Sequence, residues 1–187
     1  IDLLGKPLIA YTIEQSLASR IQRTFVSTDS SKIAKVASDY GAEVPFLRPA
    51  ELAQDDSVIE DALRFTLGRL EETEGYKPDV LVLLQPTAPL RTAGHIDDCL
   101  DLLEKEDSDS VVSVSEPMEH PADMVFWEEF GSMRFLLEHL IEPGITQRHG
   151  FPECFFINGL VYVFRADVFH ETGSRFGGRT VPYFMAQ

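Results

Sequence analysis

A polar amide and an arginine, Gln85 and Arg91, lie at the two ends of a proline-rich turn. The turn reads Gln-Pro-Thr-Ala-Pro-Leu-Arg and follows an apolar run that ends at Leu84. Its two prolines have a fixed φ and hold the turn rigid. A fixed amide and a guanidinium suit an oxygen-rich anionic ligand, because a guanidinium binds carboxylate and phosphate oxygens through paired hydrogen bonds. A stiff turn in which Gln85 satisfies backbone groups explains the same residues.

Two more arginines are candidates for the same chemistry. Arg48 follows a short β-rich segment, and the helix expected near Ser57 offers unpaired backbone N–H groups to an anion. Arg148 precedes a β-rich segment in which Asn158 comes directly before Gly159, a residue that permits close backbone approach. The alternatives are a surface arginine beside an ordinary helix cap for Arg48 and a rim charge for Arg148.

Other catalytic chemistries have no matching pattern in the sequence. Nothing resembles a Ser-His-Asp set, a Walker A loop, a Rossmann glycine fingerprint or a zinc site. The two cysteines, Cys99 and Cys154, lie in an expected helix and beside aromatic residues, so we expect both to be small buried side chains. They do not form a disulfide framework, and a reducing cytoplasm fits best.

Alternating strands and helices must position these residues. Apolar residues at helical spacing predict helices at about 7–19, from the Asp29-Ser30 cap to Gly41, at about 58–70 and from the Thr92 cap through Leu103. Apolar and β-branched runs predict strands at 24–28, 43–47, 80–84, 110–114 and 155–165. The run 80–84 shows no alternation, which is typical of a parallel strand covered on both faces, so we place it at the centre of the sheet.

The order of these elements predicts a three-layer α/β domain. In such sheets ligands bind beyond the carboxyl ends of the strands. The loops after Thr28, Leu47, Leu84 and Val114 are therefore the places where a site is expected.

Composition and charge exclude several classes of protein. The 187 residues, 44% apolar and 25% charged, suit a single folded domain and no disordered or fibrous class. Sixteen basic and thirty-one acidic residues give a net charge of −15, which repels polyanions, so we expect no nucleic-acid partner. No apolar run approaches the roughly 20 residues of a membrane span, and we expect no membrane partner.

Six motifs in a fixed order carry a family resemblance. They lie at residues 4–11, 26–29, 41–52, 83–91, 109–114 and 158–159. Together they resemble the acylneuraminate cytidylyltransferases, the CMP-sialic acid synthetases and their relatives that act on other nonulosonic acids. The resemblance implies a nucleotide-diphosphosugar-transferase-like, Rossmann-like α/β/α fold with a mainly parallel sheet.

The resemblance also implies a reaction. CTP activates an acidic nine-carbon sugar, and pyrophosphate is released with the help of Mg²⁺. The anomeric hydroxyl of the sugar attacks the α-phosphate of CTP in line with the departing pyrophosphate. Catalysis of this type depends chiefly on positioning and charge neutralisation.

The substrate-binding residues follow from the same resemblance and from the need for local cations near CTP. Arg48 is expected to contact the nucleotide, and Asn158 to lie near the junction of nucleotide and sugar. Gln85 and Arg148 are expected to line the sugar-acid side with Tyr162 and to be the catalytic residues. The full expected set is Arg48, Gln85, Arg91, Arg148, Asn158 and Tyr162. Core packing on a β-rich segment explains Tyr162 equally well.

The sequence departs from the family pattern at its two ends and at several internal positions. The family's first strand and its glycine-rich basic loop would precede Ile1, and the aspartate pair that holds Mg²⁺ would follow Gln187. Phe156 stands where the better-known bacterial members carry an arginine, and Val58 and Ile59 replace small hydroxyl residues. We therefore expect this segment to be incomplete at both ends, inactive alone and without its own Mg²⁺ ligands.

Residues 116–145 interrupt the alternation of strands and helices with many large apolar side chains. Such an excursion needs a covering surface, which its own domain or a second copy could supply. Related synthetases use the corresponding excursion to form a two-fold dimer. We therefore expect a homodimer formed mainly by residues 118–142, with Trp127 and the stretch 135–140 as anchors. The whole chain is then one domain, 1–187, with 116–145 as its dimerisation excursion.

Two other functions fit the same pattern. A cytidylyltransferase for the eight-carbon acid Kdo, or a pyrophosphorylase for neutral sugars, has the same fold; a neutral sugar would leave Arg148 without a carboxylate partner. A non-catalytic scaffold or binding homologue is the alternative from a different class. Its motive is the absence of the basic loop and of the aspartate pair from the segment.

Overall fold

The computed structural model describes residues 1–128, 131–137 and 150–185. The chain divides into two compact units. The large unit contains Ile1–Ser113 and Gly159–Tyr183, and the small unit contains Val114–Asn158 and Phe184–Gln187. Within the described residues, no helix is both long enough and apolar enough to cross a bilayer.

Five helices form in the described residues. They are α1 Leu8–Ala18, α2 Ser31–Asp39, α3 Ile59–Glu74, α4 Ala93–Lys105 and α5 Ala166–Thr172. The expected caps of α2 and α4 are confirmed: Ser30 Oγ accepts from the N–H of Ile33 at 3.4 Å, and Thr92 Oγ1 accepts from that of His95 at 3.3 Å. Nδ1 of the His95 ring in turn accepts from the Thr92 N–H at 3.3 Å, which completes a capping box.

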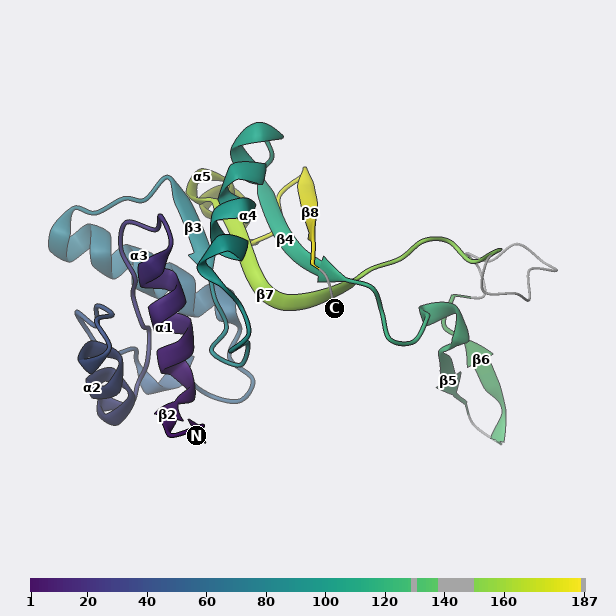
Figure 1. Ribbon diagram of the computed structural model, residues 1–187, viewed down its shortest axis with the longest axis horizontal. Coiled ribbons are helices and arrows are strands. Elements are labelled where there is room, and N and C mark those ends of the chain that lie inside the picture. The colour runs from purple at the N-terminus through teal and green to yellow at the C-terminus, as the bar shows by residue number, and fades with distance from the viewer. Residues whose placement is uncertain (129–130, 138–149, 186–187) are drawn as a thin grey trace. The chain divides into compact units, whose positions relative to one another are not determined.

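The main sheet has the strand order β3-β7-β4-β8 (Figure 1). Its members are β3 Val80–Leu83, β4 Ser110–Ser115, β7 Phe156–Arg165 and β8 Thr180–Phe184. Strand β3 pairs antiparallel with β7, so this pairing departs from the expected parallel arrangement. The predicted central place of β3 is wrong for the described sheet, because β3 lies at one edge. An apolar run indicates that both faces of a strand are buried. It does not indicate whether the strand has a hydrogen-bonded neighbour on both of its edges.

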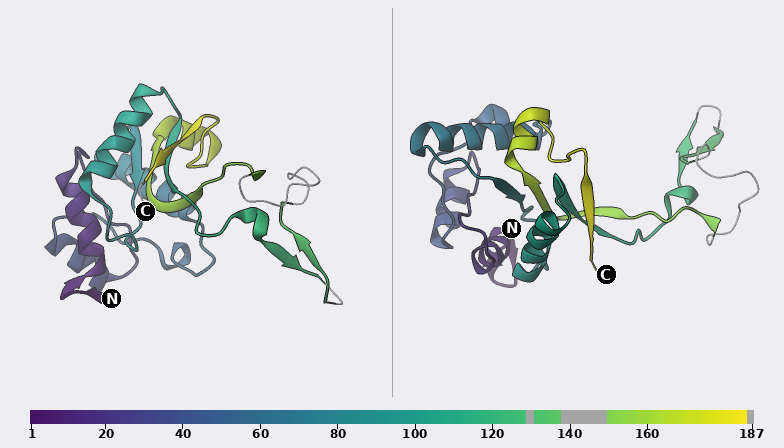
Figure 2. Two further views of the ribbon diagram at one scale, coloured as in Figure 1. Left: turned by 45° about the vertical axis from the view of Figure 1, so that its right-hand side comes forward. Right: turned by 90° about the horizontal axis from the view of Figure 1, so that it is seen from above.

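Helices cover both faces of the sheet (Figure 2). On one face, Ile96, Cys99 and Leu103 of α4 form a core with Val161 and Val163 of β7. On the other face, the ring of Phe164 packs against that of Phe169 on α5, with centroids 5.6 Å apart. Successive residues of β7 thus point to opposite faces, as the period of a strand requires. The predicted α/β layering is confirmed.

Two predicted strands shorten to a single bridge. Phe25 and Glu43 pair in parallel, with the N–H of Glu43 2.8 Å from the carbonyl of Thr24 and that of Val26 3.0 Å from the carbonyl of Glu43. Two short strands, β1 Asp2–Leu3 and β2 Lys6–Pro7, precede α1 in the sequence and pair antiparallel with each other. A short 3₁₀ helix, Ala50–Leu52, follows the segment that contains Arg48.

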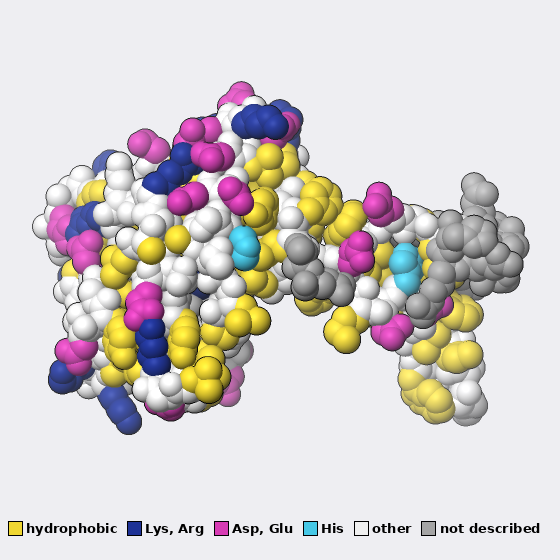
Figure 3. Space-filling view, viewed as in Figure 1, with side chains coloured by type: hydrophobic (Ala, Val, Ile, Leu, Met, Phe, Trp, Pro, Cys, Tyr) yellow, Lys and Arg dark blue, Asp and Glu magenta, His cyan; other side chains and the backbone are white. Residues whose placement is uncertain are grey.

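The small unit contains a short antiparallel hairpin. Its strands are β5 Val125–Trp127 and β6 Met133–Phe135, and a 3₁₀ helix, Pro121–Asp123, precedes β5. All six strand residues are exposed, and their hydrophobic side chains gather on the hairpin in Figure 3. The rings of Phe155 and Phe184 pack edge to face in this unit, 4.7 Å apart. Whether 116–145 serves as a dimerisation excursion stays a prediction.

Candidate functional site

Two of the predicted site residues, Gln85 and Tyr162, meet at Gly159. Residue 85 follows the carboxyl end of β3, where Leu83 pairs with Tyr162 on β7. A Cβ added to Gly159 would lie 3.0 Å from Oε1 of Gln85 and 3.8 Å from the hydroxyl of Tyr162. The Gln85 amide therefore lies directly against the backbone of Gly159, which has a φ of +74°. We call Gln85, Gly159 and Tyr162 the amide cluster.

A cation that the sequence reading missed stands beside this cluster. The guanidinium of Arg175 lies over the ring of Tyr162, 5.1 Å from its centroid, and over that of Phe176 at 5.0 Å. It also pairs with Glu60 on α3, and its buried Nε has no partner in the described part of the chain. Arg175 lies in the turn after α5, a helix too short to produce a clear periodic signal, so no pattern drew attention to it.

Arg91 lies inside the fold. Its side chain is only 2% exposed and is one of the largest fully buried side chains in the described structure. Burial lowers the pKa of its guanidinium to about 10. The guanidinium donates to Thr12 Oγ1 at 2.8 Å, to the carbonyl of Leu160, and to the carbonyl of Gln85 at 3.3 and 3.4 Å. Its buried Nε has no hydrogen-bond partner within the described residues. Direct contact between Arg91 and a substrate stays a prediction.

Arg48 holds two of the expected ligand loops together. Its backbone N–H donates to the carbonyl of Thr28 at 2.8 Å, which places the loop after Leu47 beside the loop after Thr28. The side chain is half-buried, and within the described residues its buried Nε has no hydrogen-bond partner. An unsatisfied buried donor is costly, so an added acceptor such as a nucleotide oxygen would stabilise this arginine.

The remaining predicted residues lie elsewhere. Asn158 is a half-buried residue of β7 in the small unit, directly before Gly159. Arg148 falls outside the described residues. Phe156, at the position where the resemblance expects an arginine, is 62% exposed.

The described residues do not fit a magnesium site. Across 1–128, 131–137 and 150–185, no three His, Cys, Asp or Glu side chains gather closely enough to hold a metal ion. Mg²⁺ coordination needs carboxylate oxygens in a near-octahedral set. None of these described residues is therefore assigned to Mg²⁺ as a ligand.

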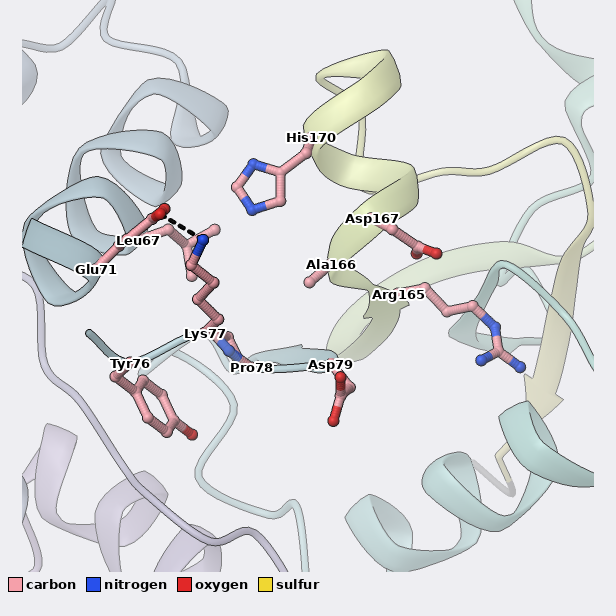
Figure 4. Close-up of a pocket in the computed structure, with 10 residues that line it drawn as sticks. All are labelled: Leu67, Glu71, Tyr76, Lys77, Pro78, Asp79, Arg165, Ala166, Asp167 and His170. Atoms are coloured by element: carbon pink, nitrogen blue, oxygen red, sulfur yellow. Dashed lines mark ion pairs between the residues drawn. The ribbon is translucent and has the colours of Figure 1, made fainter. Parts of the chain in front are cut away.

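A shallow pocket of about 410 Å³ lies at the opposite end of β3 and contains none of the predicted site residues (Figure 4). Lys77 and Asp79 line it just before β3, and Arg165 lines it from the end of β7. Glu71 pairs with Lys77 at 2.6 Å, and this contact lowers the pKa of the carboxyl group. Charges of both signs line the pocket, with no excess that selects one ligand class.

A layered α/β domain with an amide and arginines beyond the end of a strand is typical of proteins that bind nucleotides or sugar phosphates. Residues 1–129 match the family model described as cytidylyltransferase. The chain belongs to the cytidylyltransferase family, whose members are nucleotidyltransferases.

Two curated relatives are named for acidic-sugar chemistry. The N-acylneuraminate cytidylyltransferase of Streptococcus agalactiae is 29% identical over 188 residues, covering 99% of this chain and 43% of the relative. The CMP-N,N'-diacetyllegionaminic acid synthase of Legionella pneumophila is 43% identical over 114 residues, covering 60% of this chain and 48% of the relative. The chain thus matches less than half the length of each relative.

A solved structure has the same fold. CMP:2-keto-3-deoxy-manno-octonic acid synthetase, complexed with CTP, superposes with a TM-score of 0.67 at 13% identity, covering 99% of this chain and 82% of that one. At this identity the likeness concerns the fold alone. It confirms the expected Rossmann-like nucleotidyltransferase architecture.

Proposed function

We propose that this chain carries the transferase domain of an enzyme that activates a nonulosonic acid with CTP. The products are the CMP-sugar and pyrophosphate. The match of residues 1–129 to the cytidylyltransferases carries the proposal, and relatives named for sialic and legionaminic acids support the class of acceptor.

The amide cluster is the sugar side of the proposed site. The amide of Gln85 lies against Gly159 on an exposed side chain, a position from which it can hydrogen-bond a polyhydroxylated acid. Arg175 is stacked on Tyr162 and paired with Glu60, and its unsatisfied Nε near the same place suits a carboxylate oxygen. Arg148 is proposed as the bidentate partner of the sugar carboxylate, and Asn158 as a contact near the junction with the nucleotide.

Arg48 is the proposed nucleotide contact. The unsatisfied Nε and the two joined loops at this residue suit a phosphate or ribose oxygen. Local cations are needed here, because a chain of net charge −15 otherwise repels CTP. Mg²⁺ is proposed as a further source of neutralisation, with ligands outside the described residues, and no step of the reaction is assigned to it here.

The proposed enzyme is a cytoplasmic homodimer. Both cysteines are free thiols, which suits a reducing compartment. Trp127 is 81% exposed on the hairpin, together with exposed Phe126, Met133 and Phe135. A second copy that covers this surface would remove a large apolar patch from water.

Pyrophosphate release from CTP tests the function in the full-length protein. The assay contains Mg²⁺ and, in separate reactions, sialic, legionaminic or pseudaminic acid or Kdo. Release with at least one of the three nine-carbon acids, and none without an acid, is the expected result. Release with Kdo alone would move the assignment to the eight-carbon acid. No release with any acid would refute the proposal and favour a non-catalytic homologue.

A further inference from the structure

Arg91 joins three segments that are distant in the sequence. Its guanidinium donates to the hydroxyl of Thr12 on α1, to the carbonyl of Gln85 after β3 and to the carbonyl of Leu160 on β7. A side chain that is 2% exposed and carries a charge is uncommon in a protein interior. Neutral oxygens satisfy that charge only through several hydrogen bonds at once. Both terminal nitrogens of Arg91 make such bonds, and its buried Nε has no partner within the described residues.

Two of the three segments contain the amide cluster. The carbonyl of Gln85 belongs to the residue whose side chain lies against Gly159, and the carbonyl of Leu160 belongs to the residue directly after Gly159. One planar guanidinium thus holds the backbone at Gln85 and the backbone at Leu160 together. The contact between the Gln85 side chain and Gly159 depends on the separation of these two backbones. Thr12 in turn fixes the guanidinium from α1 at 2.8 Å.

We propose that Arg91 is a positioning residue that sets the place of the Gln85 amide without touching the substrate. The inference rests on the proposed function, since it assigns a use to Gln85. It differs from the expectation that Arg91 binds substrate directly, because the side chain is 2% exposed and protein oxygens already accept from both of its terminal nitrogens.

The geometry requires an arginine. A guanidinium presents its donors in a rigid planar fork, and at Arg91 they reach two carbonyls and a hydroxyl. A lysine ammonium is a compact charge on a flexible stem, and it cannot span the same three acceptors. Burial lowers the pKa of Arg91 only to about 10, so the guanidinium keeps its charge at neutral pH.

The test is a double-mutant cycle between Arg91→Lys and Gln85→Ala in the full-length enzyme. If Arg91 acts through Gln85, Arg91→Lys lowers kcat/KM for the sugar acid by about tenfold and changes the KM for CTP by less than about twofold. The double variant is then no slower than Gln85→Ala alone. Losses that multiply in the double variant would overturn the proposal.

Arg165→Lys is the matched control. It makes the same substitution at an arginine that takes no part in this arrangement and whose Nε donates to the carbonyl of Ser108 at 2.9 Å, so kcat/KM is expected to stay within about twofold of the unchanged enzyme. A loss equal to that of Arg91→Lys would assign the effect to general destabilisation and contradict the specific role.

Amide hydrogen exchange separates this proposal from the proposed function. Arg91→Lys is expected to accelerate exchange in residues 85–91 and 159–161, and Arg165→Lys is not. The faster exchange is expected even if no acid supports pyrophosphate release. In that case the proposed function is wrong, but Arg91 still positions the two backbones. Unchanged exchange in Arg91→Lys would refute the positioning role. If Arg91→Lys does not fold, Arg91→Gln replaces it, and loss of the fold in both variants assigns Arg91 to stability alone.

Discussion

At the scale of single residues, Gly159 is the position where backbone and site depend on each other most directly. Its φ of +74° strains any residue with a Cβ, and that Cβ would lie 3.0 Å from the Gln85 amide oxygen. Gly75 ends α3 at a similar φ of +66°, with nothing within 4 Å of its added Cβ. A side chain at either glycine would therefore strain the backbone in the same way, but only at Gly159 would it also contact another residue, Gln85.

Gly159→Ala is expected to lower both stability and turnover, and Gly75→Ala stability alone. Each change strains the backbone by about 1 kcal/mol, but only the first displaces Gln85. Thermal unfolding and kcat/KM measured on both variants check this. Equal activity in the two variants would show that the exact place of the Gln85 amide does not matter for the reaction.

Gln85→Ala is expected to impair turnover without unfolding the protein. The change removes a polar group from a turn at the end of β3 and no core volume, so the free energy of unfolding should fall by less than about 1 kcal/mol. Arg148→Ala is expected to behave in the same way. Normal activity together with a large loss of melting temperature would make either residue structural.

The two cysteines are expected to differ in reactivity. Cys99 is fully buried in α4, and burial raises the pKa of its thiol to about 12, so little thiolate forms at neutral pH. Cys154 is half-buried, which corrects the expectation that both side chains lie in the interior. A thiol reagent should label Cys154 in the native protein and Cys99 only after unfolding. Labelling of a Cys154→Ser variant under native conditions would contradict this.

At the scale of elements, the capping box of α4 links the turn 85–91 to the helix behind it. Thr92 directly follows Arg91, and its side chain caps the first turn of α4. Thr92→Ala is expected to lower the free energy of unfolding by about 1 kcal/mol, because it leaves a helix N–H unsatisfied. The exposed Thr73→Ala on α3 is the control and should change it by less than about 0.5 kcal/mol. Denaturant unfolding of both variants measures the difference.

Local chemistry explains which elements could be predicted from the sequence. Caps such as Ser30 and Thr92 and the apolar face of α4 are encoded within a few residues, so the helices begin and end close to the expected places. The edge position of β3 depends on pairing with β7, far away in the sequence. Helix α5 has only seven residues and gives no clear period, and Arg175 in the turn after it was missed for that reason.

The site shows the same division. Gln85 is predicted from a motif and Tyr162 from the family resemblance alone, with core packing as an equal alternative; the structure brings the two together at Gly159, where Tyr162 is buried. The burial of Arg91 could not be predicted, because it depends on α1, β7 and the turn after β3 meeting at one point. The arginine at position 91 predicts an anionic ligand. In the folded protein its guanidinium donates instead to oxygens of the protein itself.

At the scale of the whole molecule, the exposed hairpin of the small unit predicts assembly. A stable interface buries about 800 Å² on each partner, more than six short-strand residues provide, so neighbouring exposed residues must contribute. Phe156 at 62% and Ile157 at 44% exposure belong to the same unit as the hairpin and add further exposed apolar side chains to that unit. Since large aromatic side chains dominate binding energy at such surfaces, Trp127 and Phe135 are the expected anchors.

Light scattering of the full-length protein at micromolar concentration is expected to give twice the mass of one chain. Replacing Trp127 and Phe135 by serine removes the two anchors and should give the mass of a monomer. Leu90→Ser is the control, because Leu90 is 88% exposed, comparable to Trp127, but lies on the large unit. A dimer that survives the double replacement would place the interface elsewhere, and a monomer mass for the unchanged protein would show that the hairpin is covered by something other than a second copy.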